Sequence, residues 1–478
     1  MNKIYLKSVV CFLLIFIFIG STSAQLDRSV EPQSGPSFKM SIPKIERVTL
    51  DNGLRILVVE HRELPVVQIQ LVVRSGADAD IPEKAGVASL TADMIDEGTK
   101  TKTSLQIADE LDFIGASAAT SANYDASIGS LLTLKEHLSK AMTIFSDIIL
   151  NPNFSENEFD RLKSELLTDL LSQKVRPDII ASNIFNAKVF GSQHPYSQSV
   201  DGSEETVKDI NLNDLKEYYN KFYAPNNASV IIVGDITKTE AVAVVKQFFG
   251  NWKKKKIPPP KLFNPPISTE NKIYLVNKDK APQSQIRIGN IGIERRSPDF
   301  YAVNILNQIL GASNGRLFLN LREAKGYTYG AYANFAMRKS AGPFVAYAGV
   351  KTEVTDSALI EFLKEINRIR DELVTDSEFE LYKTAVIQRL PRIFETPAQI
   401  AGQLMALELF NLPDDFFSTL VENYKAITPI DIQSAAQKYL HPQNLTVVVV
   451  GDEKNIREKI EKLGFGKIIL CDETGNEL

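Results

Sequence analysis

The chain of 478 residues carries an internal repeat, and no other feature of its sequence constrains the fold as strongly. Residues 210–235 align with residues 427–452 without a gap. In both copies a helix-like stretch runs into a turn with Pro and Asn, an apolar strand follows, and Gly-Asp ends the strand. A second match pairs residues 158–159 with residues 378–379 at an offset that differs by only three residues. Chance similarity between two strand-turn units is the alternative, and the nearly shared offset argues against it. Nine aligned positions are identical, and in the first copy they are Ile210, Asp214, Lys221, Pro225, Asn227, Val230, Val233, Gly234 and Asp235.

The pattern around each copy mixes strands with helices. Residues 230–233 and 447–450 are runs of four apolar residues, which suit strands that are buried on both faces. Residues 156–173 show helical periodicity after Ser155, a residue type favoured at the N-cap, and residues 377–389 repeat that pattern. We therefore predict an α+β fold of two homologous domains, each a mixed sheet packed with helices.

Changes in composition divide the chain. We place the N-terminal domain at residues 46–252 and the C-terminal domain at residues 272–470, both within the usual size range of a domain. The linker between them, residues 253–271, begins with a run of Lys and contains consecutive prolines, which favour an extended and semi-rigid conformation. Residues 25–45 are polar with Pro and Gly, and we predict a flexible lead-in there.

The N-terminus is typical of a cleavable signal peptide, residues 1–24. Lys3 and Lys7 precede an uncharged apolar run at residues 9–19, and the small residues that end at Ala24 fit a cleavage site. The segment is neither Arg-rich nor amphipathic, as a mitochondrial transit peptide would be. We therefore expect a secreted protein in the periplasm of a bacterium. An uncleaved anchor is the alternative, and the apolar run is short for a membrane span.

Composition excludes several classes of function. Hydrophobic content of 44% and charged content of 24% are ordinary for a soluble globular protein. The net charge of -5 shows no basic bias, so nucleic acid is not expected as a partner. Of the two Cys, Cys11 lies in the predicted signal peptide. Cys471 is therefore left without a partner for an internal disulfide or a Cys-based metal cluster.

Residues 86–94 have the pattern of a helix that would carry the inverted zinc motif H-x-x-E-H, but without the residues that bind zinc. Ser89 stands at the position of the first His, Ala92 at that of the Glu, and Asp93 at that of the second His. No two of the four His are close enough in sequence to restore the motif; they are His61, His137, His194 and His441.

Through these segments the chain resembles the inverzincin family, the M16 peptidases similar to insulinase and to mitochondrial processing peptidase. The resemblance extends from about residue 48 to residue 466. In the C-terminal domain, residues 315–323 followed by residues 326–329 resemble the Arg/Tyr signature of the family. The matching segments of the N-terminal domain are residues 50–54, 75–77, 86–99 and 194–196.

The resemblance implies how a member that cuts peptides binds zinc. Two His on one helix and a Glu on a later helix hold the ion, and the motif Glu is the general base. Aligning residues 159–161 with the usual start of the later helix places Asp169 at the Glu position. Ser89 is a poor ligand, and Ala92 can do no acid–base chemistry. Because two carboxylates and a hydroxyl would form a weak and unselective site, we expect no metal or other cofactor on this chain. We interpret Ser89, Asp93 and Asp169 as parts of a polar, hydrated helix face.

Arg322 and Tyr329 match the Arg and Tyr of the family with the same spacing. In active members, the resemblance implies, such a pair comes from the second domain, hydrogen-bonds the developing oxyanion and holds the substrate backbone. The alternative is an Arg in a surface ion pair, for instance with Glu323, and a Tyr in the core.

The chain thus retains the second-domain part of an active site and lacks the first-domain part. Some members of the family divide these parts between two subunits. We therefore predict a non-catalytic subunit of a heteromeric zinc metallopeptidase, in a heterodimer or larger assembly. It would show little activity alone and supply Arg322 and Tyr329 in trans to an H-x-x-E-H partner that binds the zinc and acts with it on a peptide substrate.

Two other hypotheses stay open. In the first, the chain is an inactive pseudo-peptidase that acts as a structural scaffold or binds peptides, and the Arg/Tyr pair is dispensable. In the second, it is a solitary enzyme with other chemistry, which the lack of a Gly-x-Ser-x-Gly elbow, a phosphate loop and a Cys–His pair disfavours. Residues 116–122, low in charge, are either a sheet edge that takes up substrate by strand addition or a vestigial edge.

Overall fold

The computed structural model describes residues 42–259, 263, 265–266 and 268–478, all within one compact unit formed by residues 41–478. The predicted signal peptide, residues 1–24, lies outside the described residues. So do residues 25–41 of the predicted lead-in and five positions of the predicted linker, which are residues 260–262, 264 and 267. Among the described residues, no helix is both long enough and apolar enough to cross a membrane.

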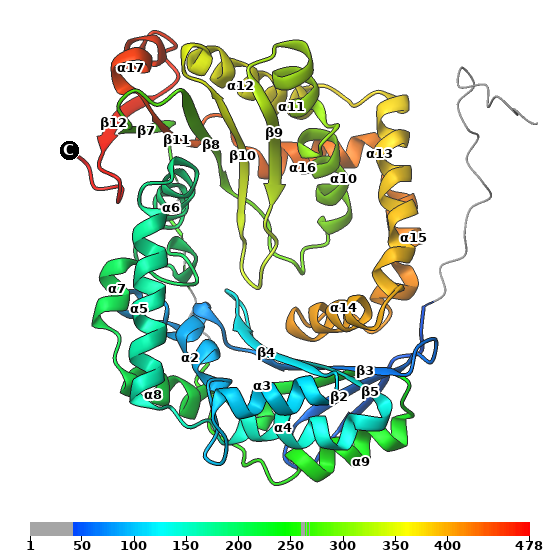
Figure 1. The fold of residues 1–478 in the computed structure, drawn as a ribbon. Helices are drawn as coiled ribbons and strands as arrows, with labels where there is room; N and C mark the ends of the chain where they lie inside the picture. Colours follow the sequence, from blue (N-terminus) through cyan, green and yellow to red (C-terminus); the bar gives the residue numbers. More distant parts are fainter. Residues whose placement is uncertain (1–41, 260–262, 264, 267) are drawn as a thin grey trace, which may run out of the picture. The chain divides into compact units, whose positions relative to one another are not determined.

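Two six-stranded mixed sheets form the framework of this unit (Figure 1). The first has the order β1-β2-β6-β3-β5-β4 and the second the order β12-β7-β11-β8-β10-β9, so β4 and β9 are corresponding edge strands. Strand β6 pairs parallel to β2, and β11 parallel to β7, while the neighbours on their other sides are antiparallel. The strands are β1 (Glu46–Thr49), β2 (Arg55–Glu60), β3 (Val66–Val73), β4 (Ser117–Ala122), β5 (Ser127–Leu134), β6 (Ala228–Gly234), β7 (Lys272–Asn277), β8 (Gln283–Ile291), β9 (Thr328–Phe335), β10 (Pro343–Lys351), β11 (Thr446–Gly451) and β12 (Lys467–Cys471).

Helices follow in a similar order in the two halves. Those of the first half are α2 (Val87–Ile95), α3 (Ser104–Phe113), α4 (Leu138–Leu150), α5 (Glu156–Gln173), α6 (Pro177–Phe190), α7 (Glu204–Asp209), α8 (Leu212–Phe222) and α9 (Lys238–Phe249). Those of the second half are α10 (Phe300–Gly311), α11 (Arg316–Phe318), α12 (Thr355–Asp371), α13 (Asp376–Arg389), α14 (Pro397–Leu409), α15 (Phe416–Ala426), α16 (Pro429–Tyr439) and α17 (Glu453–Glu461).

The internal repeat corresponds to α8 with β6 and to α16 with β11, and the two apolar strands are fully buried, as predicted. The identical Asp214 and Asp431 have the same local role. Each closes a capping box at the start of its helix, with Asn211 and Thr428 as the N-cap residues. Helix α5 has the predicted bounds, but Ser155 at its N-cap makes no capping hydrogen bond.

The two halves exchange helices. Helix α6 of the first half packs on β8 and β11 of the second sheet, and α14 of the second half packs on β3 and β6 of the first sheet (Figure 1). The exchange places apolar side chains of α6 in one core with residues of β7 and β11. This core consists of Ile180, Ala181, Ile184, Phe185, Val189, Phe190, Tyr196, Tyr274, Val276, Val448, Val450 and Cys471.

Glu408 fixes α14 to the first sheet through its buried carboxylate. The Oε2 atom accepts a hydrogen bond from Ser229 Oγ at 2.9 Å and lies 3.1 Å from Arg55 Nη2 and 3.2 Å from Arg74 Nη2. One carboxylate therefore pairs with two guanidinium groups of the other half, Arg55 on β2 and Arg74 directly after β3.

We expect Glu408→Ala to lower the free energy of unfolding by about 2 kcal/mol. Breaking a fully buried ion pair costs about 3–5 kcal/mol, and water that reaches the partly exposed guanidinium groups reduces that penalty. Urea denaturation measures the change. The control is Glu422→Ala, which removes an exposed carboxylate paired with Lys425 and should cost less than about 0.5 kcal/mol. Equal midpoints for the two variants would contradict the assigned role of Glu408.

Candidate functional site

Helix α2 occupies the predicted residues and begins at a buried carboxylate. Asp80 accepts hydrogen bonds from the backbone N–H groups of Gly86, at 3.0 Å, and Ala88, at 3.1 Å, at the start of the helix. Burial raises the pKa of Asp80 well above its usual range, against these hydrogen bonds, which act to lower it. Gly86 has a φ of 106°, and an added Cβ would lie 2.9 Å from the carbonyl oxygen of Asp201, so a glycine is required there.

Two of the three altered positions of the zinc motif have ordinary structural partners. The Ser89 hydroxyl donates to Asp201 Oδ1 at 2.8 Å. Ala92 is fully buried, and its carbonyl accepts a hydrogen bond from Thr120 Oγ1 on the edge strand β4 at 2.5 Å. Asp93 follows on the same helix and is exposed. Ser89 and Ala92 thus connect helix α2 to Asp201 and to the edge strand β4.

The carboxylates near Asp93 disfavour its ionised form. The protein around the Asp93 carboxyl displaces water and raises its pKa to about 7, and the charges of Asp201, Asp96 and Glu97 act in the same direction. Burial likewise raises the pKa of Asp96 to about 6, although the backbone N–H of Thr120 donates to it. A zinc site here needs imidazole nitrogens and a carboxylate around the ion, and Ser89 and Ala92 offer a hydroxyl and a methyl group in the places of the first His and the general base.

Asp93 should make stability depend on pH. Between about pH 4, where an unfolded Asp ionises, and about pH 7, the folded chain holds a proton at Asp93 that the unfolded chain has lost. Its contribution therefore favours folding at low pH and disappears as the pH rises through about 7. Asp93→Asn should then gain melting temperature relative to the parent as the pH rises from about 5 to about 8, by a small amount because solvent screens an exposed group. A difference that stays constant over this range in calorimetry would contradict the raised pKa.

Asp169 is an exposed residue of α5, next to the buried Leu170. Helix α5 packs on α2, and Arg161 Nη2 of α5 forms an ion pair at 2.6 Å with Oε1 of Glu97, which follows α2. Across the described ranges, no group of three or more His, Cys, Asp or Glu side chains is arranged to hold a metal ion. The residues at the degenerate motif do not fit zinc.

Arg322 and Tyr329 lie near the start of the edge strand β9. Arg322 belongs to a π-helical turn, Leu319–Ala324, and Tyr329 is the second residue of β9. The Arg322 guanidinium lies 4.8 Å from the ring centre of Phe318 and 3.5 Å from Glu323 Oε1. Tyr329 is 84% exposed, so the alternative of a core Tyr is wrong, whereas the expected ion pair with Glu323 is present. Both groups are accessible to another molecule.

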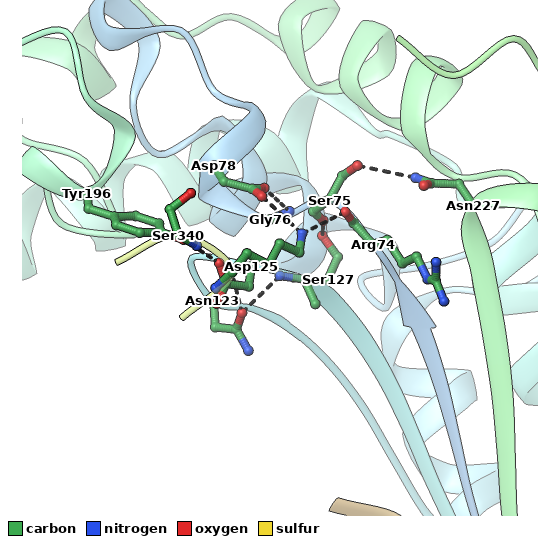
Figure 2. Close-up of polar contacts among 12 residues, drawn as sticks. Arg74, Ser75, Gly76, Asp78, Asn123, Asp125, Ser127, Tyr196, Asn227 and Ser340 are labelled. Carbon is green, nitrogen blue, oxygen red and sulfur yellow. Dashed lines mark hydrogen bonds and ion pairs between the residues drawn. The ribbon is translucent and has the colours of Figure 1, made fainter. Parts of the chain in front are cut away.

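A polar network joins the two halves, and it was not predicted from the sequence. Of its residues, only those of the segment 194–196 stand out there, as part of the family resemblance. Tyr196 and Asp125 lie together at this contact (Figure 2), and the Tyr196 hydroxyl donates to Asp125 Oδ1 at 2.6 Å. Lys339 Nζ donates to Asp78 Oδ2 at 2.9 Å. His194 accepts a hydrogen bond at Nδ1 from the backbone N–H of Tyr196 at 3.0 Å. Burial, with Arg338 nearby, lowers the pKa of His194 to about 4, so this His is neutral and structural.

Comparison with family models decides the identity of this fold. Residues 55–194 match the model described as Insulinase (Peptidase family M16), and residues 209–386 match the one described as Peptidase M16 inactive domain. The chain belongs to the M16 peptidase family. Its two halves are M16 domains, each with a mixed sheet packed with helices.

Solved structures and relatives agree with the M16 assignment. A crystal structure described as a peptidase M16 inactive domain from Pseudomonas fluorescens has 27% identity and a TM-score of 0.80, covering 85% of this chain and 98% of that one. The "Uncharacterized zinc protease YmxG" of Bacillus subtilis is 26% identical over 70% of this chain and 81% of its own length. The "Non-peptidase homolog YmxG" of Helicobacter pylori is 23% identical over 84% of this chain and 92% of its own length.

Proposed function

We propose that this chain is the non-catalytic subunit of a heteromeric M16 zinc peptidase and supplies Arg322 and Tyr329 in trans. The observation that carries the proposal is an imbalance between the two halves. The second half presents both members of the Arg/Tyr pair to solvent, while α2 of the first half has Ser89, Ala92 and Asp93 where zinc chemistry needs His, Glu and His.

The exposed pair has the chemistry that peptide hydrolysis needs from a second subunit. A tyrosine hydroxyl and a guanidinium both donate hydrogen bonds, so they can stabilise an oxyanion that develops on the scissile carbonyl and hold the peptide backbone. The zinc and the general base would belong to a partner with an intact H-x-x-E-H motif. This chain itself would bind no cofactor and would have little peptidase activity alone.

The names of two relatives bear on this proposal, one on the lack of peptidase activity and one on assembly. The Helicobacter pylori relative is named a non-peptidase homolog. An Arabidopsis thaliana relative, 20% identical over 86% of this chain, is named a probable mitochondrial-processing peptidase subunit beta, and a subunit acts within an assembly. These names describe the relatives; the first supports a chain without its own peptidase activity, and the second supports a chain that works as one subunit of a peptidase.

The second candidate function is that of a pseudo-peptidase that binds peptides or acts as a scaffold. The observation in its favour is β4, which pairs only with β5 within the described sheet and has the exposed small residues Ser117, Ala119 and Ser121 on one face. An extended peptide can pair with such an edge without any catalysis. In that case Arg322 and Tyr329 are dispensable.

Hydrolysis of a quenched fluorescent peptide library tests the proposal. The processed chain, starting at residue 25, is assayed alone and mixed with the zinc-motif M16 chain encoded beside it. We expect activity in the mixture only, abolished by a chelator. A complex that forms but stays inactive would favour the scaffold. Chelator-sensitive activity of this chain alone would show that the assignment of Ser89, Ala92 and Asp93 is wrong.

We also propose that the protein is secreted to the bacterial periplasm, from the sequence of residues 1–24. Cell fractionation with mass spectrometry of the N-terminus tests this location. A mature N-terminus at Gln25 in the periplasmic fraction is the expected result, and a full-length chain in the membrane fraction would indicate an uncleaved anchor.

A further inference from the structure

The turn between β9 and β10, residues 336–342, reaches the first half of the chain through three consecutive residues. The middle residue, Lys339, places its ammonium group between two acceptors of the first half. Its Nζ donates to the carbonyl oxygen of Arg74 at 2.8 Å and to Asp78 Oδ2 at 2.9 Å. Both side chains of the Lys339–Asp78 pair are mostly buried, so the charges are less screened than those of a surface pair.

The neighbouring residues of the turn add contacts with the same region. The backbone N–H of Lys339 donates to Asp125 Oδ2 at 3.3 Å, and that of Ser340 donates to the Tyr196 hydroxyl at 3.4 Å. The Arg338 guanidinium lies 3.7 Å from the ring centre of Tyr124 and 4.6 Å from that of Tyr196, which is cation–π geometry. Each of the three turn residues therefore has a partner in the first half.

The first-half side of this contact is a set of loops fixed by its own hydrogen bonds (Figure 2). Gly76 N donates to Asp78 Oδ1 at 3.0 Å, and Asn123 Oδ1 accepts from the N–H of Asp125 at 2.8 Å. The two loops approach so closely that a Cβ on Gly76 would lie 2.2 Å from the carbonyl oxygen of Asn123. The acceptors for the turn are thus positioned by hydrogen bonds within the first half itself.

Arg74 joins this contact to the exchanged helix α14. Its carbonyl oxygen accepts from Lys339, while its guanidinium donates to both the side chain and the carbonyl oxygen of Glu408. Two separate elements of the second half, the β9–β10 turn and α14, therefore both contact Arg74, the residue that follows β3. The hairpin turn is fixed to the part of the first half that also holds α14.

We propose that Lys339 is a positioning residue which, together with Arg338, anchors the β9–β10 hairpin to the first half and so orients Tyr329. Among the described residues, β9 pairs with β10 alone; α10 and α11 pack on the strand, and the contacts of the turn fix the free tip of its hairpin. Tyr329 is on this strand, at the end away from the turn. The effect on catalysis rests on the proposed function, whereas the anchoring itself does not.

Hydrogen exchange of the processed chain, without any partner, tests the anchor. Lys339→Met keeps the length of the side chain and removes its charge, and Lys339→Arg keeps the charge. We expect peptides that cover residues 328–342 to exchange about tenfold faster in Lys339→Met, the factor that accompanies loss of a charge-assisted hydrogen bond, and near the parent rate in Lys339→Arg. The control is Lys438→Ala, which breaks a Lys–Asp pair with Asp299 inside the second half and should leave these peptides unchanged. Unchanged exchange in both Lys339→Met and Arg338→Ala would overturn the proposal.

Kinetics of the complex with the zinc-motif partner test the positioning role separately. A displaced Tyr329 should lower kcat about tenfold in Lys339→Met while KM changes less than about twofold, because the interaction lost is made in the transition state. Lys339→Arg should restore kcat. Faster exchange with an unchanged kcat would overturn the positioning role. If no mixture has activity, the proposed function fails, and hydrogen exchange still decides whether the anchor exists.

Discussion

Replacing Tyr329 by Phe should lower kcat of the reconstituted complex by about 10²–10³-fold, the usual loss when one donor to an oxyanion is removed. The change removes a single hydroxyl from a side chain that is 84% exposed, so the fold should not respond. Arg322→Ala should cause a loss of similar size. Because Arg322 also lies against the Phe318 ring, this second variant removes packing as well as donors.

The matched control for Tyr329→Phe lies on the same strand. Tyr332→Phe also removes one tyrosine hydroxyl from β9, where the Tyr332 ring faces Tyr347 at 5.7 Å, and should leave kcat within about twofold of the parent. Full activity in both Tyr329→Phe and Arg322→Ala would reject the role in trans and favour the scaffold. Equal losses of kcat in Tyr329→Phe and Tyr332→Phe would show that activity is lost on any substitution in β9. The Tyr329 hydroxyl would then have no specific catalytic role.

Local features of the fold could be read from the sequence because each depends on residues close together in the chain. The four-residue apolar runs at residues 230–233 and 447–450 predicted strands buried on both faces, and the periodicity after Ser155 gave the bounds of α5. The edge position of residues 116–122 was also expected, and β4 is at the edge of its sheet.

The remaining features depend on residues far apart in sequence. The apolar face of α6 predicts burial, but periodicity does not say which sheet covers it, and the covering sheet belongs to the other half of the chain. Likewise, Asp201 accepts a hydrogen bond from the hydroxyl of Ser89, which lies 112 residues away in the sequence. Lys339 donates a hydrogen bond to Asp78, which lies 261 residues away. Single charged residues at such separations leave no local pattern. The roles of Arg322 and Tyr329 stay predictions, because they require a second chain.

The exchange of α6 and α14 makes the two halves depend on each other for their cores. Phe185 of α6 is 2% exposed and lies in the core that includes Tyr274 and Val448 of the second sheet. Without α6, that part of the second sheet would expose its apolar side chains to water, and without α14 the first sheet would do the same over β3 and β6. The first half has a core of its own residues, but each half leaves a sheet face uncovered without the helix of the other, so we expect a single cooperative unfolding transition.

Phe185→Ala should therefore lower the free energy of unfolding by about 3–5 kcal/mol, the usual cost of truncating a fully buried Phe. The single Trp of the chain, Trp252, packs against the core of the first half and reports on that half in urea denaturation, while circular dichroism reports on both. Because α6 joins the halves, both signals should shift together to lower urea. The control is Asn183→Ala on the exposed side of the same helix, which should change stability by less than about 0.5 kcal/mol. A Trp252 transition that stays in place while the dichroism signal splits into two steps would show that the halves unfold as independent domains.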